Sequence, residues 1–466
     1  MSLDGPARRS NIEASVEPAV KSPSSDGETA LMRAAALGDV AEVRRHLDEC
    51  GRRDASGRTA LMIAAQQDHK EVVELLLEHE KGMRDNQNRT ALYHALNSGH
   101  MEAAKAILPY EDPTDEYGVT ALMRTADRGD IEVARLLTPL QKGMHASEIV
   151  KLEGWNVRER TALMGAAAYG HIEIVRLLVD HEGGMRDDRN QTALIYAVSR
   201  NYLDCAEILL DKEVCMRSKQ GWTALMWAAR YNRPKCVMLL LEREARMQTD
   251  YGWTALMIAA KRGSTECIPL LLEKECGIQD DYDSTALMFA AKNNRPECVR
   301  LLLEKEARMQ NYHGWTALMW ATTHRHTECV ELLLEKEAGI PNNDGWTAFM
   351  IAAKKDSIEC AKLLLEKEAC MQARNGMTAL MVAACKGHAD CVELLLVKEA
   401  GMQDRKGWTA LMYATYNNRL DCVKLLAERE KDMKTTHKWN WFPPGTAALD
   451  IAKEMGRTGI ASIPSG

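Results

Sequence analysis

The strongest constraint in this sequence is a Thr-Ala-Leu motif, with Phe once in place of Leu, that returns at a nearly fixed spacing. From Thr161 onward each step is 31 residues, and the earlier steps are 30, 31, 30 and 41 residues. A period of this length is typical of a solenoid, in which each unit packs on its neighbours. A length of 466 residues alone would suggest about three globular domains. The repeat instead predicts one quasi-linear array. The motif begins at Thr29, Thr59, Thr90, Thr120, Thr161, Thr192, Thr223, Thr254, Thr285, Thr316, Thr347, Thr378 and Thr409.

Each unit reads as two helices and a loop, counted here with the Thr as position 1. The Thr precedes A-L-M-x-A-A, and its hydroxyl can accept a hydrogen bond from a free N–H of the first helical turn. Apolar positions 3, 6 and 7 then mark the buried face of a short helix. Positions 12–22, as in residues 296–306, carry Cys, Val and Leu at helical spacing and predict a second helix. A short loop with Gly and Asp turn signals follows.

These residues resemble the ankyrin repeat, whose pattern runs G-x-T-P-L-H-x-A-A and then V-x-x-L-L-x-x-G-A. The resemblance runs from Thr29 to the C-terminus, with a degenerate last copy that starts near Ala447. It implies an all-α solenoid of helix-turn-helix units with short finger loops, about 14 repeats of 31 residues. The abundance of Met and Trp is also similar to ankyrin arrays of diplomonad protists, some of which are joined to protein kinase domains. No kinase motif is present here.

The sequence departs from the family pattern at the end of the second helix. Glu occupies position 22, where the family has a Gly suited to a left-handed helix cap. Gly instead recurs two residues later, as at Gly184 and Gly277. We therefore expect a longer second helix and a finger shorter by two residues. Met also replaces the family's His at position 4, so that adaptable apolar packing takes the place of hydrogen bonds.

Two segments interrupt the repeat, one over 145–155 and one at the start of 435–466. Each has three interpretations: a hinge, a lid, or a tolerated loop insertion. The polar, Ser- and Pro-rich start lacks the apolar stretch of a secretory signal and predicts disorder. The expected organisation is a disordered tail over 1–25, N-terminal repeats over 26–144, an insertion over 145–155, regular repeats over 156–434, and an insertion with a capping repeat over 435–466.

Cysteine usage indicates a reduced protein. Eight of the 13 Cys fall at position 14, and equivalent atoms of neighbouring units lie ~8–10 Å apart, too far for a disulfide. We therefore expect buried, inert thiols, a cytoplasmic protein, and association with the cytoskeleton as a further option. No run of 18 apolar residues predicts a membrane span. The position-14 cysteines are Cys205, Cys236, Cys267, Cys298, Cys329, Cys360, Cys391 and Cys422.

The sequence predicts a protein that is not an enzyme and holds no cofactor. No P-loop, G-x-S-x-G, H-E-x-x-H or dinucleotide fingerprint occurs. The acidic pair in the recurrent L-E-K-E-A is interpreted as a solvated face, because it repeats with the structural period. The cluster from His324 to Cys329 invites a metal reading, but its ligands do not plainly converge, and no metal is expected.

Two sets of residues form the candidate binding site. Trp residues stand directly before the capping Thr, where they can either pack as a hydrophobic staple on position 5 or contact a ligand. Positions 8 and 9 of the same repeats are mostly basic, although the chain carries a net charge of -7. The candidate residues are Trp222, Arg230, Tyr231, Trp253, Lys261, Arg262, Lys292, Trp315, His324, Trp346, Lys354 and Lys355.

The leading functional hypothesis is a non-enzymatic protein-protein interaction scaffold that binds on its concave surface. The partner is expected to be a protein that presents an acidic, partly extended segment between Trp222 and Lys355. The alternative is a regulatory or substrate-recruiting subunit of an enzyme, for example a kinase, carried on another chain. A nucleic-acid partner is disfavoured because the overall acidity opposes phosphate binding.

Overall fold

The computed structural model describes residues 27–112, 114, 117–152 and 155–462. The tail predicted over 1–25 lies outside these residues. Two compact units are present. One comprises the described residues up to Thr125 together with Asp130–Met144, and the other comprises Ala126–Gly129 and the described residues from His145 onward.

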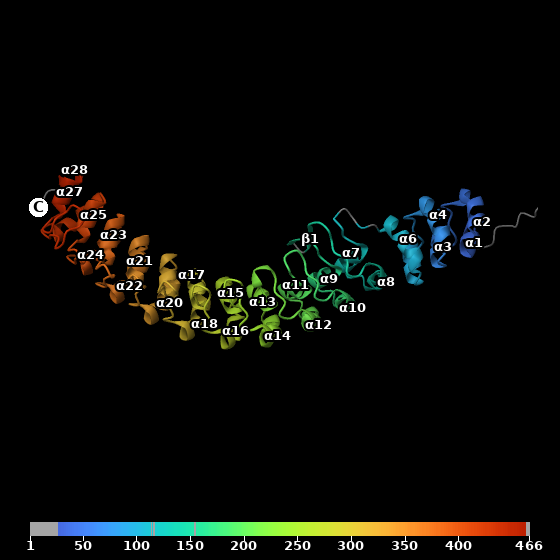
Figure 1. Ribbon diagram of the computed structural model, residues 1–466, viewed down its shortest axis with the longest axis horizontal. Helices are drawn as coiled ribbons and strands as arrows, with labels where there is room; N and C mark the ends of the chain where they lie inside the picture. The colour runs from blue at the N-terminus through green and yellow to red at the C-terminus, as the bar shows by residue number, and fades with distance from the viewer. Residues whose placement is uncertain (1–26, 113, 115–116, 153–154, 463–466) are drawn as a thin grey trace, which may run out of the picture. The chain divides into compact units, whose positions relative to one another are not determined.

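The first unit consists of paired helices, joined by short loops (Figure 1). Its elements are α1 Ala30–Leu37, α2 Val40–Arg45, the 3-10 helix η1 Leu47–Glu49, α3 Ala60–Gln66, α4 Lys70–Glu80, α5 Ala91–Asn97, α6 Met101–Glu111, α8 Ile131–Gln141, and most of α7 Ala121–Arg128.

The second unit repeats the same helix pair and begins with a short hairpin. Its elements are β1 Val150–Leu152, β2 Trp155–Val157, α9 Ala162–Tyr169, α10 Ile172–Glu182, α11 Ala193–Arg200, α12 Leu203–Glu213, the 3-10 helix η2 Lys219–Gly221, α13 Ala224–Arg230, α14 Pro234–Glu244, α15 Ala255–Arg262, α16 Ile268–Glu275, α17 Ala286–Lys292, α18 Pro296–Glu306, α19 Ala317–Thr323, α20 Thr327–Glu337, α21 Ala348–Lys355, α22 Ile358–Glu368, α23 Ala379–Lys386, α24 Ala389–Glu399, α25 Ala410–Tyr416, α26 Leu420–Glu430, α27 Ala448–Glu454 and α28 Thr458–Ala461.

The helices of the second unit lie in two rows. Each first helix packs on the next first helix, as α13 does on α15 and α15 on α17, while second helices such as α18 and α20 pack on one another. Figure 1 shows the odd-numbered helices α13 to α25 following one another along one side of this unit. The predicted helical repeat with short finger loops is confirmed, and most first helices begin immediately after the predicted Thr.

The capping role of the Thr is confirmed in several repeats. The Oγ1 atom of Thr254 accepts a hydrogen bond from the backbone N–H of Met257 at 3.4 Å, and Thr316 accepts one from Met319 at 3.4 Å. Both Met side chains are only 1% exposed, so the residue that replaces the family's His packs in the core. Small Ala residues at positions 6 and 7, such as Ala259 and Ala260, are fully buried and allow neighbouring first helices to approach closely.

The acidic pair at the end of the second helix is not wholly solvated, which corrects the interpretation of L-E-K-E-A. Glu304 is exposed, but Glu306, two residues later, is only 1% exposed. Its Oε1 atom accepts a hydrogen bond from Gly277 N at 3.1 Å and its Oε2 atom accepts one from Leu287 N at 2.8 Å. Both oxygens are used in the same way in a buried row: Glu80, Glu213, Glu244, Glu275, Glu306, Glu337, Glu368, Glu399 and Glu430.

This bonding accounts for the displaced glycine. The donor to Oε1 is the backbone of position 24 in the preceding repeat, which takes a left-handed conformation, with φ of 73° at Gly277 and 71° at Arg308. Gly adopts this region without strain, whereas Arg308 and Cys370 hold it against a steric cost. The second helix runs through position 22, as expected, and the left-handed residue lies two positions after its end.

The cysteines at position 14 lie in the core, as predicted. Cys236, Cys267 and Cys298 have no exposed surface, and burial raises the pKa of Cys236 and Cys298 to about 11. All 13 cysteines carry free thiols. Two of them, Cys215 and Cys370, lie outside the row and are exposed.

The insertion predicted over 145–155 forms part of an antiparallel hairpin that the sequence reading missed. Strand β1 pairs with β2 through the register Val150 with Val157 and Leu152 with Trp155. Leu152 and Val157 are fully buried, so this segment is anchored by its own apolar side chains. The rest of the described fold is helical apart from two isolated bridges near the C-terminus.

Candidate interaction surface

The first helices and the finger loops of the second unit share one face, named here the inner face. Its basic residues occupy the last turn of α13, α15, α17 and α21 but not of α19, and Arg262, Lys292, Lys354 and Lys355 among them are exposed. Positions 8 and 9 were predicted to face outward, and the structure agrees for these residues and for His324. Position 8 is partly covered in the repeats of Thr223 and Thr254, where Arg230 and Lys261 are half-buried. Tyr231, at position 9, is also half-buried.

The tryptophans before the capping Thr form the predicted hydrophobic staples in three repeats. The ring of Trp222 lies 5.2 Å from that of Trp227, and the ring of Trp315 lies 5.0 Å from that of Trp320. Trp408 makes the same contact with Tyr413 at 5.2 Å. Packing does not bury all of these rings, however. The tryptophans that remain half-buried are Trp222, Trp253, Trp315 and Trp346.

The basic side chains lie over the tryptophan rings, a contact that the sequence pattern did not predict. The Nζ atom of Lys261 lies 4.2 Å from the centre of the Trp253 ring, and Lys354 lies 5.1 Å from that of Trp346. Such contacts are favourable because the ring face is electron-rich. Further cations cover rings in the same way: Arg230 over Trp222, Trp227 and Tyr231, and Lys292 over Trp320.

The inner and outer faces differ in how their cations are neutralised. On the outer helices, Lys274 pairs with Glu242 at 3.2 Å and Lys336 pairs with Glu304 at 3.0 Å. Within the described residues, no ion pair joins a carboxylate to the cations at positions 8 and 9 of the repeats from Thr223 to Thr347, although on the finger loops Arg217 pairs with Asp250 at 3.1 Å. Burial lowers the pKa of Lys261, and the neighbouring Arg262, Lys292 and Arg230 lower it further. The unpaired inner-face cations are Arg230, Lys261, Arg262, Lys292, Lys354 and Lys355.

The histidines near residue 325 lie beside the aromatic residues of this surface. His324 stacks on Trp320 at 6.1 Å and on His326 at 5.7 Å, while Cys329 is buried in the core. The Nε2 atom of His326 lies 3.2 Å from the backbone oxygen of Lys292 in the preceding repeat. No group of three or more metal-ligating side chains is found in the part of the chain that the structure describes.

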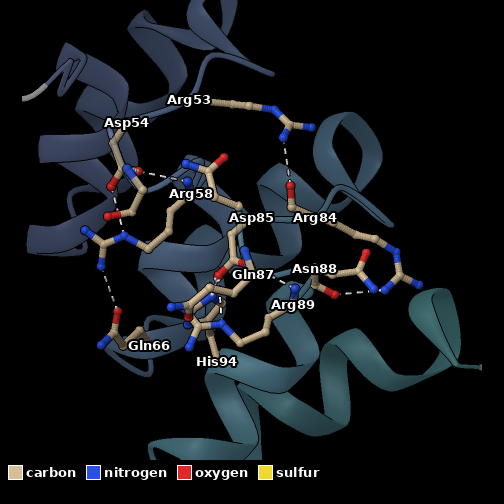
Figure 2. Close-up of polar contacts among 12 residues, drawn as sticks. Arg53, Asp54, Arg58, Gln66, Arg84, Asp85, Gln87, Asn88, Arg89 and His94 are labelled. Carbon is tan, nitrogen blue, oxygen red and sulfur yellow. Dashed lines mark hydrogen bonds and ion pairs between the residues drawn. The ribbon is translucent and has the colours of Figure 1, made fainter.

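The fingers of the first unit have a different chemistry (Figure 2). Arg89 occupies the position before the Thr, and its Nε atom donates to Asp85 at 2.9 Å, while Asp85 also lies 3.0 Å from His94. Burial acts to raise the pKa of Asp85, but the hydrogen bonds from Arg89, Gln87 and His94 hold it well below its usual range. Arg58 pairs with Asp54 in the same way, at 2.8 Å. Arg89 and Arg58 are therefore already neutralised, unlike the cations at positions 8 and 9 of the repeats from Thr223 to Thr347.

A further aromatic site lies at the C-terminal end of the array. Trp439, from the predicted insertion after 434, places its ring 4.4 Å from Trp408 and 5.0 Å from Tyr416. The Nζ atom of Lys406 lies 5.8 Å from the Trp439 ring. The sequence signal was present as a segment rich in Trp and Pro, but nothing in the repeat pattern indicated where it would pack.

A row of like helix pairs that shares one aromatic and basic face defines a helical repeat protein. A family model described as ankyrin repeats (three copies) matches overlapping stretches that run continuously from residues 9–85 to residues 368–438. The chain belongs to the ankyrin-repeat family, whose repeats are in general protein-protein interaction modules. No curated protein matches this chain at a significant level. None of the helices that the structure describes is long and apolar enough to span a bilayer.

Proposed function

We propose that this protein is a non-enzymatic scaffold that binds an acidic, partly extended segment of another protein on its inner face. The binding region runs from Trp222 to Lys355, over the five repeats that begin at Thr223 to Thr347. The observation that carries the proposal is the row of cations without carboxylate partners, most of which lie against aromatic rings.

The electrostatic argument rests on the contrast between the two faces. Outer cations such as Lys336 are paired with carboxylates, so their charge is largely neutralised. The like charges at Lys261, Arg262 and Lys292 instead add to one positive potential. A segment of opposite charge relieves this repulsion and is drawn to the surface by it. The half-buried tryptophans add apolar contact, so that binding does not depend on charge alone.

Binding of a defined acidic probe tests this function. The probe is a fluorescein-labelled peptide of alternating Glu and Ser, about 16 residues long, titrated against the full chain by fluorescence polarisation. The inner-face variant carries Lys261→Glu, Arg262→Glu, Lys354→Glu and Lys355→Glu. The matched control carries the same charge change on the outer helices: Lys274→Glu, Lys336→Glu, Lys367→Glu and Lys398→Glu.

The inner-face variant should bind at least about tenfold more weakly than the wild type, and the outer control should stay within about threefold. Equal losses in the two variants would show that only net charge matters. A peptide of alternating Lys and Ser that bound as tightly as the acidic one would reject the proposal outright.

A further inference from the structure

We infer that the bound segment carries aromatic side chains beside its carboxylates, two of them three residues apart, and that these pack on the tryptophans of adjacent repeats. The inference rests on the proposed function and specifies its ligand. The two pairs of receiving rings are Trp222 with Trp253, and Trp315 with Trp346.

The chain itself shows how such a ring is received. Trp439 lies edge to face on Trp408, with an interplanar angle of 70° and 4.4 Å between ring centres. The Nζ atom of Lys406 lies over the Trp439 ring, 5.8 Å from its centre. An aromatic side chain from outside the helical repeat thus packs on a tryptophan of the inner face and beneath a cation.

Trp408 is more fully covered than the equivalent tryptophans of other repeats, although Phe289 already lies edge to face on Trp253 at 5.0 Å. Trp408 is only 1% exposed, whereas the equivalent Trp253 and Trp346 remain half-buried. At position 8, the repeat of Trp408 carries Tyr416, which also contacts Trp439 at 5.0 Å. The other two repeats carry a Lys at this position, and its Nζ atom is the group that covers the ring. Tyr416 also contacts Trp408 directly at 5.8 Å, so the residue at position 8 lies against the tryptophan in each of these repeats, as an aromatic ring in one and as a Lys in the other two.

The chemistry of the partner follows from that Lys. An aromatic ring that packs on Trp346 as Trp439 packs on Trp408 also meets the residue at position 8, Lys354, whose ammonium group has no carboxylate partner. A carboxylate beside the incoming ring supplies one, and Lys355 is exposed on the next position to hold another. A purely acidic segment leaves the tryptophans half-covered, and a purely aromatic one leaves the cations unpaired.

The spacing follows from the repeat. Adjacent first helices pack ~8–10 Å apart, and an extended segment in the polyproline II conformation advances ~3.1 Å per residue and brings every third side chain back to the same side. Two aromatic side chains three residues apart therefore match two adjacent repeats. The row of tryptophans is interrupted by Ser284, which occupies the equivalent position in the repeat of Thr285. For this reason the surface offers two pairs of rings in place of one continuous series.

Selection from a random peptide library tests the inference without assuming a partner. Phage that display random peptides about 12 residues long are selected on the immobilised full chain, and the enriched sequences are read. We expect net negative peptides with two aromatic residues three apart. Synthetic copies should bind the double variant Trp315→Ala, Trp346→Ala at least about fivefold more weakly than the wild type, and lose more when Trp222→Ala and Trp253→Ala are added.

The matched control is Trp441→Ala, which removes a tryptophan that is 59% exposed and lies outside the inner-face row. Because the Trp315 ring also packs on Trp320, circular dichroism must show that each variant keeps the wild-type helix content. Replacement of Lys354 with Gln, which leaves the tryptophans intact, should also weaken binding of the selected peptides.

The outcomes separate the two proposals. Enrichment of acidic peptides without the aromatic spacing, or equal binding by the Trp315→Ala, Trp346→Ala and Trp441→Ala variants, overturns the inference and leaves the proposed function standing. Enrichment of peptides that are not acidic, or no enrichment at all, counts against both.

Discussion

Glu306 accepts a hydrogen bond from the backbone N–H of Leu287, nineteen residues earlier in the chain, at 2.8 Å. The acceptor is the last residue of α18 and the donor lies in the first turn of α17, so one carboxylate closes the helix pair of its own repeat. Its second oxygen binds Gly277 of the preceding repeat at 3.1 Å. An anion at a helix N-terminus is favoured by the free N–H groups there. The buried glutamates thus fasten each repeat to itself and to its neighbour.

Replacement of Glu306 with Gln should destabilise the second unit by about 1–3 kcal/mol, because the amide nitrogen cannot accept from the second N–H donor. Gln141 already occupies this position in the repeat of Thr120, where its Oε1 atom accepts from Leu122 N at 2.8 Å, so the substitution is compatible with folding. Urea unfolding followed by circular dichroism measures the effect.

The control for this substitution is Glu304→Gln, two residues away on the exposed side of the same helix. Its ion pair with Lys336 is solvent-exposed and should contribute no more than about 0.5 kcal/mol. Equal effects of the two substitutions would show that the buried hydrogen bonds do not stabilise the array.

The same carboxylate makes stability depend on pH. Burial raises the pKa of Glu306, against the hydrogen bonds from Leu287 and Gly277 that lower it. A folded-state pKa above the unfolded value means that the folded protein binds the proton more tightly, so stability falls as pH rises between the two values. The cost of Glu306→Gln should therefore be larger at about pH 5 than at about pH 7.5. A cost that grows with pH would mean that the folded state prefers the charged form.

Thiol reactivity should divide the cysteines by burial. Cys267 and Cys391 have no exposed surface, and burial raises the pKa of each to about 12, so few of these thiols are ionised at neutral pH. The exposed Cys215 and Cys370 should react first with iodoacetamide. Mass spectrometry of peptides taken during native labelling gives the order. Rapid labelling at most position-14 cysteines would show that the second helices open readily.

Much of the fold could be predicted because the same pattern recurs in each repeat, so a helix that is ambiguous in one copy is indicated by the equivalent residues of the others. A capping Thr before Ala-Leu, or once Ala-Phe, seen thirteen times, located the first helices, and the Cys at one fixed position indicated which side of the second helix is buried. The staple of Trp222 on Trp227 followed from the spacing of two apolar residues across a helix start.

The rest required coordinates because it depends on contacts that cross repeats. Glu304 and Glu306 look alike in sequence, and only the positions of Gly277 and Leu287 make the second one a buried acceptor. The contact between Lys292 and the Trp320 ring joins different repeats, so no pattern within one repeat predicts it. The hairpin at Val150 lies in a segment without a repeat, where the period carries no information.

The association rate of the acidic peptide, measured by stopped-flow fluorescence over a range of salt concentrations, tests the central claim most directly. For the wild type we expect a rate that falls steeply with added salt, because unpaired inner-face cations attract the peptide before contact. The variant with Glu at positions 261, 262, 354 and 355 should associate at least about tenfold more slowly and show a flatter salt response, while the outer-helix control behaves as the wild type does. An inner-face variant that keeps both the wild-type rate and its salt dependence would contradict the account and leave the basic row as a solvated surface.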